Sequence, residues 1–87
     1  MEERRAHRRI LLDAAVRLYH PRLGTVEGAI RDLSDSGVRV AVADAAGLSR
    51  SLNGESITLR PQHLDVLFDT ELVRCDGDCV VLRFIEP

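Results

Sequence analysis

Arginines crowd the beginning of the chain, where Arg4, Arg5, Arg8 and Arg9 fall within a stretch of six residues and lysine is absent from the whole sequence. An arginine guanidinium is a planar fork that binds phosphate through two hydrogen bonds and stacks on flat rings, whereas a lysine ammonium is a point charge. This choice of residue predicts an arm that grips an anion. A solvated basic tail is the alternative interpretation, and the arm by itself does not decide between the two.

A second polar motif, with the sequence DLSDSG at residues 32–37, stands between two strand-like segments. Asp32 and Ser34 are two residues apart, so their side chains point to the same side of an extended backbone. A carboxylate accepts hydrogen bonds and a hydroxyl both donates and accepts them, which suits the donor-rich edge of guanine. Gly37 can adopt backbone angles closed to other residues. The same residue types are common in plain turns, where they cap their own backbone, so the motif alone leaves both interpretations open.

Much of the remaining chain alternates apolar and polar residues with the period of two that is typical of strands. The clearest alternation places Val38, Val40 and Val42 on one face, and in the preceding strand we expect Ile30 and Asp32 to share a face. We expect strands at residues 14–20, 25–33, 37–43, 55–60, 64–74 and 79–85, and at 44–53 a loop with one helical turn around 45–48.

The number and shortness of these strands predict an all-β fold. Asp76-Gly77 suits the tight turn of a hairpin between the last two strands. Six short antiparallel strands favour a closed or nearly closed barrel, because closure removes the exposed edges that invite aggregation. A two-sheet sandwich is the structural alternative. Phe68 and Phe84 are expected in a core packed mainly by aliphatic side chains.

Length and composition favour a single domain spanning 1–87, with a flexible arginine-rich arm at 1–12 and the barrel at 13–87. No apolar run approaches the roughly 20 residues that cross a bilayer, and the first residues do not lead into a signal peptide. We therefore expect no membrane association and a cytoplasmic location. The net charge of −2 is unremarkable beside the concentration of arginine at one end.

Catalysis finds little support in the residue pattern. His7, His20 and His63 lie far apart and no nucleophile or metal-ligand pattern surrounds any of them. Cys75 and Cys79 flank a turn across which a disulfide is one option, but free thiols are the expected state. Cys-x3-Cys without further Cys or His ligands is poor support for a zinc site. We expect a binding protein with no catalytic residues, no metal and no cofactor.

Together the two polar motifs resemble the paired signature of PilZ domains, RxxxR followed by (D/N)xSxxG. The resemblance implies a six-stranded, antiparallel split barrel that binds cyclic di-GMP, with the arginine arm wrapped around the phosphates and guanine faces and the second motif contacting a guanine. Carried over by position, the implied ligand-binding residues are Arg5, Arg9, Asp32, Ser34 and Gly37. Arg4 and Arg8 satisfy the same four-residue spacing and are the alternative register of the arm.

The resemblance also implies a downstream protein partner. The family commonly continues into a carboxy-terminal helix, which is not found before Pro87, so we expect an uncovered barrel face that pairs with a partner or with a second copy as a homodimer. Two alternatives belong to other classes. One is a PilZ-like protein-interaction module without nucleotide binding, and the other is a small nucleic-acid-binding barrel, against which the acidic net charge and the scarcity of aromatic residues argue.

Overall fold

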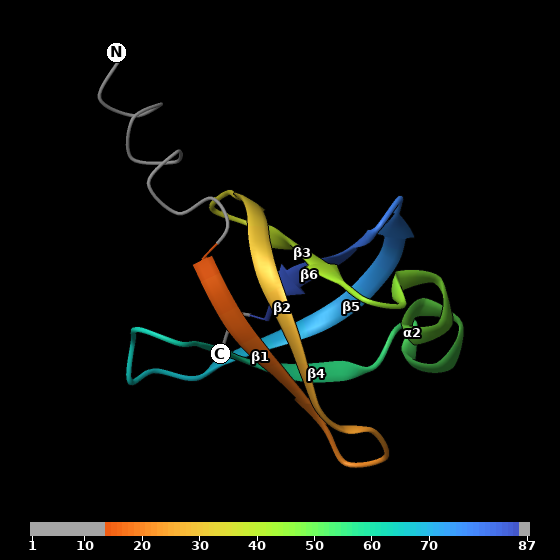
Figure 1. The fold of residues 1–87 in the computed structure, drawn as a ribbon, viewed down its shortest axis with the longest axis horizontal. Coiled ribbons are helices and arrows are strands. Elements are labelled where there is room, and N and C mark those ends of the chain that lie inside the picture. Colours follow the sequence, from red (N-terminus) through yellow and green to blue (C-terminus); the bar gives the residue numbers. More distant parts are fainter. Residues whose placement is uncertain (1–13, 86–87) are drawn as a thin grey trace.

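The computed structural model describes residues 14–85, in which six antiparallel strands close into a barrel (Figure 1). The elements are β1 (Ala14–His20), β2 (Gly24–Leu33), β3 (Gly37–Val42), α2 (Ala45–Leu52), β4 (Ser56–Pro61), β5 (Phe68–Asp76) and β6 (Cys79–Phe84). Around the barrel the order is β1-β2-β3-β6-β5-β4, and β4 pairs back onto β1. The prediction of a six-stranded antiparallel barrel is confirmed, and the sandwich alternative is wrong.

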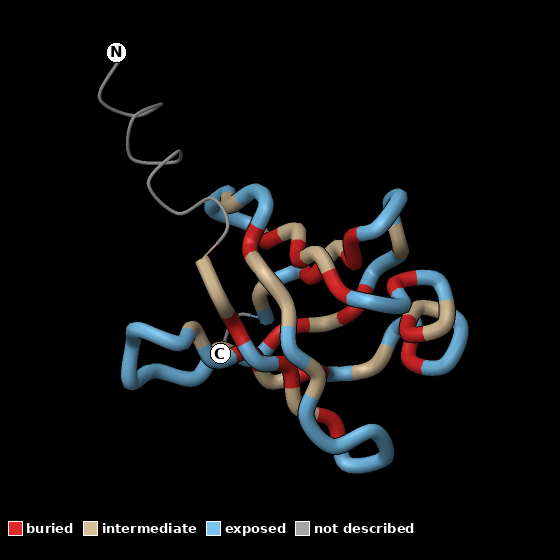
Figure 2. The backbone as a smooth tube through the Cα atoms, viewed as in Figure 1, coloured by how far each residue is buried: buried red, intermediate tan, exposed pale blue. Residues whose placement is uncertain are grey.

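Alternation of side chains fills the barrel with aliphatic residues. Val38, Val40 and Val42 of β3 point inward and are buried, as their spacing predicts. Leu72 of β5 and Leu82 of β6 have no exposed surface at all. Buried and exposed positions accordingly alternate along the strands in Figure 2. Phe68 and Phe84 are partly buried, and their rings pack at the margin of this core with centroids 5.8 Å apart.

A two-turn helix, α2, covers one end of the barrel, where the sequence suggested a loop with a single helical turn. The Asp44 side chain caps it by accepting a hydrogen bond from the Gly47 backbone N–H at 3.1 Å. Ala45, Leu48 and Leu52 are buried against the barrel, where α2 contacts β5 and β6. Serine and glycine lower the intrinsic helix propensity of this segment, and tertiary packing of its apolar face overrides that preference.

Strand β5 begins at Phe68 and not at residue 64, as the sequence predicted. The facing strand β4 ends at Pro61, which has no N–H to donate, and its last residues pair with β1. Residues 62–67 therefore form a connection outside the sheet. Within it Leu64 and Leu67 are 52% and 62% exposed, so an apolar composition alone did not make this segment a strand.

Two β-bulges interrupt the regular pairing on either side of the central β3–β6 pair. On β2 the partners shift between Ile30 and Asp32, which leaves Arg31 as the extra residue. On β5 they shift between Leu72 and Arg74, which leaves Val73 as the extra residue. A bulge reverses the facing of the residues beyond it. Asp32 is therefore exposed while Ile30 is buried, and the expectation that the two share a face is wrong.

The barrel closes tightly where β3 pairs with β6, a junction called here the β3–β6 seam. Gly37 pairs with Arg83, and a methyl group added at Gly37 would lie only 2.3 Å from the Leu82 carbonyl oxygen. Gly37 is absent from the glycines with positive φ among the described residues, which are Gly24, Gly54 and Gly77. The position therefore needs glycine for space and not for unusual backbone angles.

At the end of the barrel near α2, His20 and Glu55 join β1 to the segment before β4. His20 Nδ1 accepts from the Arg22 backbone N–H at 3.0 Å, so Nε2 is the nitrogen that donates to Glu55 Oε1, at 2.7 Å. Arg22 Nη2 donates to the other Glu55 oxygen at 2.5 Å. These contacts, led by the hydrogen bond from His20, hold the pKa of Glu55 below its ordinary value of 4.5.

We predict that Gly37→Ala destabilises the domain by about 1–3 kcal/mol, because the added methyl group forces β3 away from the Leu82 carbonyl. Asp35→Ala is the matched control, since Asp35 is an exposed residue of the same turn, and it should change stability by less than about 0.5 kcal/mol. Urea denaturation of both variants measures the difference. Equal stability of the two variants would show that the β3–β6 seam tolerates a side chain at position 37.

We also predict that Glu55→Gln weakens the acid dependence of stability. A carboxyl group whose pKa is lower in the folded state stabilises the fold above its unfolded pKa, and this contribution disappears as the pH falls through the folded pKa. The midpoint temperature of thermal unfolding should therefore fall more steeply below about pH 4.5 for the unaltered protein than for the variant. Glu27→Gln, at a 79% exposed side chain 3.9 Å from Arg17, should leave the acid profile unchanged.

Candidate functional site

The turn between β2 and β3 is organised by Ser34. Its backbone N–H donates to the Gly37 carbonyl at 2.9 Å, and its hydroxyl oxygen accepts from the backbone N–H groups of Ser36 and Gly37, each at 3.3 Å. The Ser36 carbonyl in turn accepts from the Phe84 N–H at 2.9 Å, which ties the turn to the end of β6. The capping role that serine commonly plays in turns is thus present, and Ser34 is also exposed.

Asp32 lies at the outer end of β2, where the bulge directs it to solvent. Its Oδ1 accepts a hydrogen bond from the Leu33 backbone N–H at 2.9 Å. Within residues 14–85 the carboxylate makes no other hydrogen bond or ion pair, although it lies opposite Arg39 in the register. One carboxylate oxygen therefore remains available as an acceptor for a ligand.

These residues border a hollow of about 320 Å³ on the outside of the barrel, over the β3–β6 seam and the adjoining parts of β2 and β5. The predicted site residues Asp32, Ser34 and Gly37 all line it. Between its rims, Val38, Val81 and Leu82 contribute to the lining. The hollow is lined furthermore by Arg39, Arg74 and Arg83.

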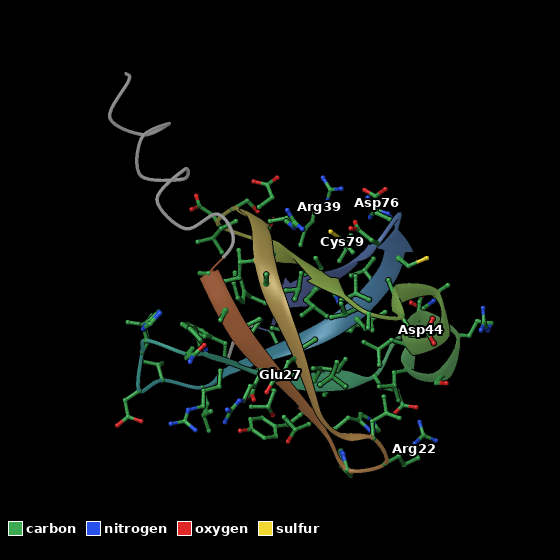
Figure 3. All side chains as sticks on the ribbon, viewed as in Figure 1. Arg22, Glu27, Arg39, Asp44, Asp76 and Cys79 are labelled. Carbon is green, nitrogen blue, oxygen red and sulfur yellow. The ribbon has the colours of Figure 1, made fainter. Side chains whose placement is uncertain are left out.

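Two of these three arginines are held by carboxylates of β5. Arg39 Nη2 lies 3.0 Å from Asp76 Oδ2, and the two labelled side chains lie side by side in Figure 3. Arg83 pairs with Glu71, its neighbour across the β5–β6 register. The Arg39 Nε atom is buried and has no hydrogen-bond partner among the described residues. The hollow therefore presents three donor-rich side chains, two of which are already held in position, an arrangement suited to an anionic or acceptor-rich ligand.

Arg4, Arg5, Arg8 and Arg9 lie outside the residues that the structure describes, so the structure does not place the first motif. Of the seven predicted binding residues, it brings together the three from the second motif. Sequence reasoning missed Arg39, Arg74 and Arg83. The register of the Asp76-Gly77 hairpin could have placed Arg74 opposite Val81, whereas the pairing of Arg83 with Glu71 depends on the bulge at Val73.

A second hollow, of about 310 Å³, lies at the end of the barrel away from α2. Its lining is apolar and includes Leu33, Leu59, Phe68 and Phe84. It offers almost no hydrogen-bonding groups, so it does not suit a charged nucleotide. Leu33 and Val38 line both hollows, which places the apolar end of the barrel next to the arginine-lined surface.

The cysteines and histidines form no reactive cluster in the part of the chain that is described. Cys75 pairs with Val80 in the register, whereas Cys79 pairs with Asp76, so the two thiols belong to opposite faces of the hairpin, and both are free. Burial raises the pKa of Cys79, which makes its thiol a poorer nucleophile. Between residues 14 and 85 no three histidine, cysteine or acidic side chains gather in a way that would hold a metal ion. The same residues contain no helix long and apolar enough to span a membrane.

Comparison with known proteins agrees with this geometry. A search of curated proteins returned no match. The family model of the PilZ domain matches residues 3–87, which is nearly the whole chain and includes both polar motifs. Over this range the chain carries the six-stranded barrel, the DLSDSG turn and the arginine-rich segment at residues 4–9. The chain therefore belongs to the PilZ domain family.

Proposed function

We propose that this chain is a receptor for cyclic di-GMP that holds the dinucleotide in the arginine-lined hollow and closes its amino-terminal arm over it. PilZ domains are generally cyclic di-GMP receptor domains, and they act as binding and regulatory modules and not as enzymes. The observation that carries the proposal for this chain is the position of Asp32 and Ser34 on the rim of a hollow that also holds three arginines.

The rim suits the hydrogen-bonding edge of guanine. A guanine presents a ring N–H and an exocyclic amino group, both donors, and Asp32 has a carboxylate oxygen that no described residue occupies. Ser34 is already held in place because its hydroxyl accepts two backbone hydrogen bonds and donates one, at 3.3 Å, to the Gly37 carbonyl. A ligand acceptor can replace that carbonyl as the partner of the hydroxyl proton. Fixed polar groups of this kind reduce the entropy lost when a ligand binds.

The arm supplies the charge that the two phosphates require. Arg5 and Arg9 are the proposed ligands, and Arg4 and Arg8 form the alternative register. Residues four apart project to the same side of an extended segment or of a helix, so either pair can face one ligand. Because the ligand links the arm to the barrel, its binding changes the surface that the domain offers to other proteins. PilZ domains typically interact with partner proteins, and we propose that this change of surface transmits the signal.

The arm register is tested by single substitutions. We predict that Arg9→Ala and Arg5→Ala each lose about 2 kcal/mol of cyclic di-GMP binding, because each removes a charge-assisted bidentate contact. Arg4→Ala and Arg8→Ala should lose less. Arg50→Ala, at the exposed end of α2, is the control and should bind as the unaltered protein does. Calorimetric titration of nucleotide-free protein measures all five, with GTP and a short RNA as competing ligands.

The outcomes of this titration separate the proposal from its rivals. Absence of heat with cyclic di-GMP at micromolar protein would leave the protein-interaction module as the better interpretation. Tighter binding to RNA, with a steep dependence on salt, would favour the nucleic-acid-binding barrel. Larger losses for Arg4→Ala and Arg8→Ala would move the arm ligands to the alternative register.

Arm closure is tested separately by hydrogen exchange. We predict that cyclic di-GMP increases the protection of backbone amides in residues 1–12 and in the turn at 32–37, because the ligand bridges the two segments. The β1–β2 hairpin around Arg22, which the hollow does not include, is the internal control and should be unaffected. Protection confined to residues 32–37 would contradict arm closure even if the nucleotide binds.

A further inference from the structure

One row of side chains crosses four strands on the outer face of the barrel. The register pairs Asp32 of β2 with Arg39 of β3, Arg39 with Val81 of β6, and Val81 with Arg74 of β5. Residues that face one another across antiparallel strands lie on the same side of the sheet. All four line the same hollow. Asp32 and Arg74 therefore stand at the two ends of one row, which has charged side chains at both ends.

Both ends of the row owe their position to a bulge. Strict alternation on β5 from buried Leu72 would turn Arg74 inward, but the extra residue Val73 restores it to the outer face. The extra residue Arg31 does the same for Asp32 on β2. Bulges that redirect a side chain are common beside binding sites. Two bulges that direct residues into a single hollow indicate that both ends of the row serve one ligand.

Arg74 differs from the other two arginines of the hollow in its partners. Arg39 is paired with Asp76 and Arg83 with Glu71. Arg74 is exposed, and within residues 14–85 it forms no hydrogen bond or ion pair. Its guanidinium is therefore available to a ligand without the loss of an existing ion pair.

The separation of the two ends restricts what Arg74 can contact. From β2 to β5 there are three interstrand spacings, a backbone separation of about 14 Å before the curvature of the barrel is taken into account. A single guanine is too small to bridge such a span. Cyclic di-GMP consists of two identical guanosine phosphate halves, so a molecule lying along the row brings its second half toward β5.

We propose that Arg74 is a third cationic ligand-binding residue, outside both sequence motifs, which contacts the half of cyclic di-GMP that Asp32 and Ser34 do not reach. This assignment rests on the proposed function. Arginine suits either feature of that half, because its fork binds a phosphate or the O6 and N7 acceptors of guanine through two hydrogen bonds. Arg74 thus extends the site from the rim at β2 across the seam to β5.

The test compares Arg74→Ala and Arg74→Lys with the matched control Arg60→Ala. Arg60 is exposed on β4, lies opposite Arg17 of β1 and does not line the hollow. In calorimetric titration we expect Arg74→Ala to bind cyclic di-GMP about tenfold or more weakly, which is the usual scale of one charge-assisted contact. Arg74→Lys should recover part of the loss, and Arg60→Ala should bind as the unaltered protein does. Thermal unfolding of each variant verifies that the barrel is intact.

Titration with GMP, which represents one half of the ligand, isolates the contact further. We expect the weak affinity for GMP to be the same in the unaltered protein and in Arg74→Ala, because the mononucleotide occupies the Asp32 end of the row. Equal losses for GMP and cyclic di-GMP would overturn the assignment of Arg74 to the second half.

These titrations distinguish a failure of the Arg74 inference from a failure of the proposed function. If the unaltered protein binds cyclic di-GMP and both Arg74 variants bind it equally well, the inference is wrong while the proposed function stands. If the unaltered protein and Arg60→Ala both show no binding, the proposed function is wrong and this inference falls with it. A loss for Arg60→Ala as large as that for Arg74→Ala would also overturn it, since a general loss of positive charge would then explain the result.

Discussion

The pairing of β3 with β6 is the constraint on which the rest of the structure depends. Strands β1, β2 and β3 follow one another as a meander, and so do β4, β5 and β6, so β3–β6 and β1–β4 are the two seams that join these halves. At the β3–β6 seam the backbones approach so closely that Gly37 has no room for a side chain. The Ser36 carbonyl extends the seam by one more hydrogen bond, to the Phe84 N–H. The arginine-lined hollow lies over this seam, so the same contacts close the barrel and shape the candidate site.

Much of the barrel could be predicted because one local rule governs it. Burial on one face imposes a period of two, and Val38, Val40 and Val42 obey it without exception. The length of helix α2 was underestimated, although the sequence holds signals for it. Asp44 is a good N-cap residue, and Leu48 and Leu52 lie four residues apart. Its stability comes from packing on β5 and β6, which a local pattern of serine and glycine does not reveal.

The bulges were missed, yet a physical clue to them stood in the sequence. Strict alternation would send Asp32 and Arg74 into an aliphatic core, where an unpaired charge is very costly. A charged side chain that falls on the inward phase of a strand therefore indicates that the phase changes before it. In both places the structure shifts the register by one residue immediately beforehand. The three residues of the second motif were found through resemblance, whereas the arginines of β3, β5 and β6 become neighbours only through the strand order.

On the proposed function, the charges of the hollow explain why the site draws on two motifs far apart in sequence. Asp76 and Glu71 neutralise Arg39 and Arg83, and Asp32 adds a negative charge at the rim, so the barrel surface alone has little excess positive charge to attract a double anion. These ion pairs also hold the two guanidiniums in place, so the surface that they offer to a ligand is already formed before binding. On the proposed function, the barrel therefore selects the base, and the arm supplies most of the charge that two phosphates require. On this proposal, binding requires closure of the arm, because a dinucleotide held by the rim alone lacks its counter-charges, and the arm alone lacks the acceptor groups of Asp32 and Ser34 that fit the donor edge of guanine. The proposed division of the site thus converts the presence of the messenger into a change of the surface that the domain offers to a partner.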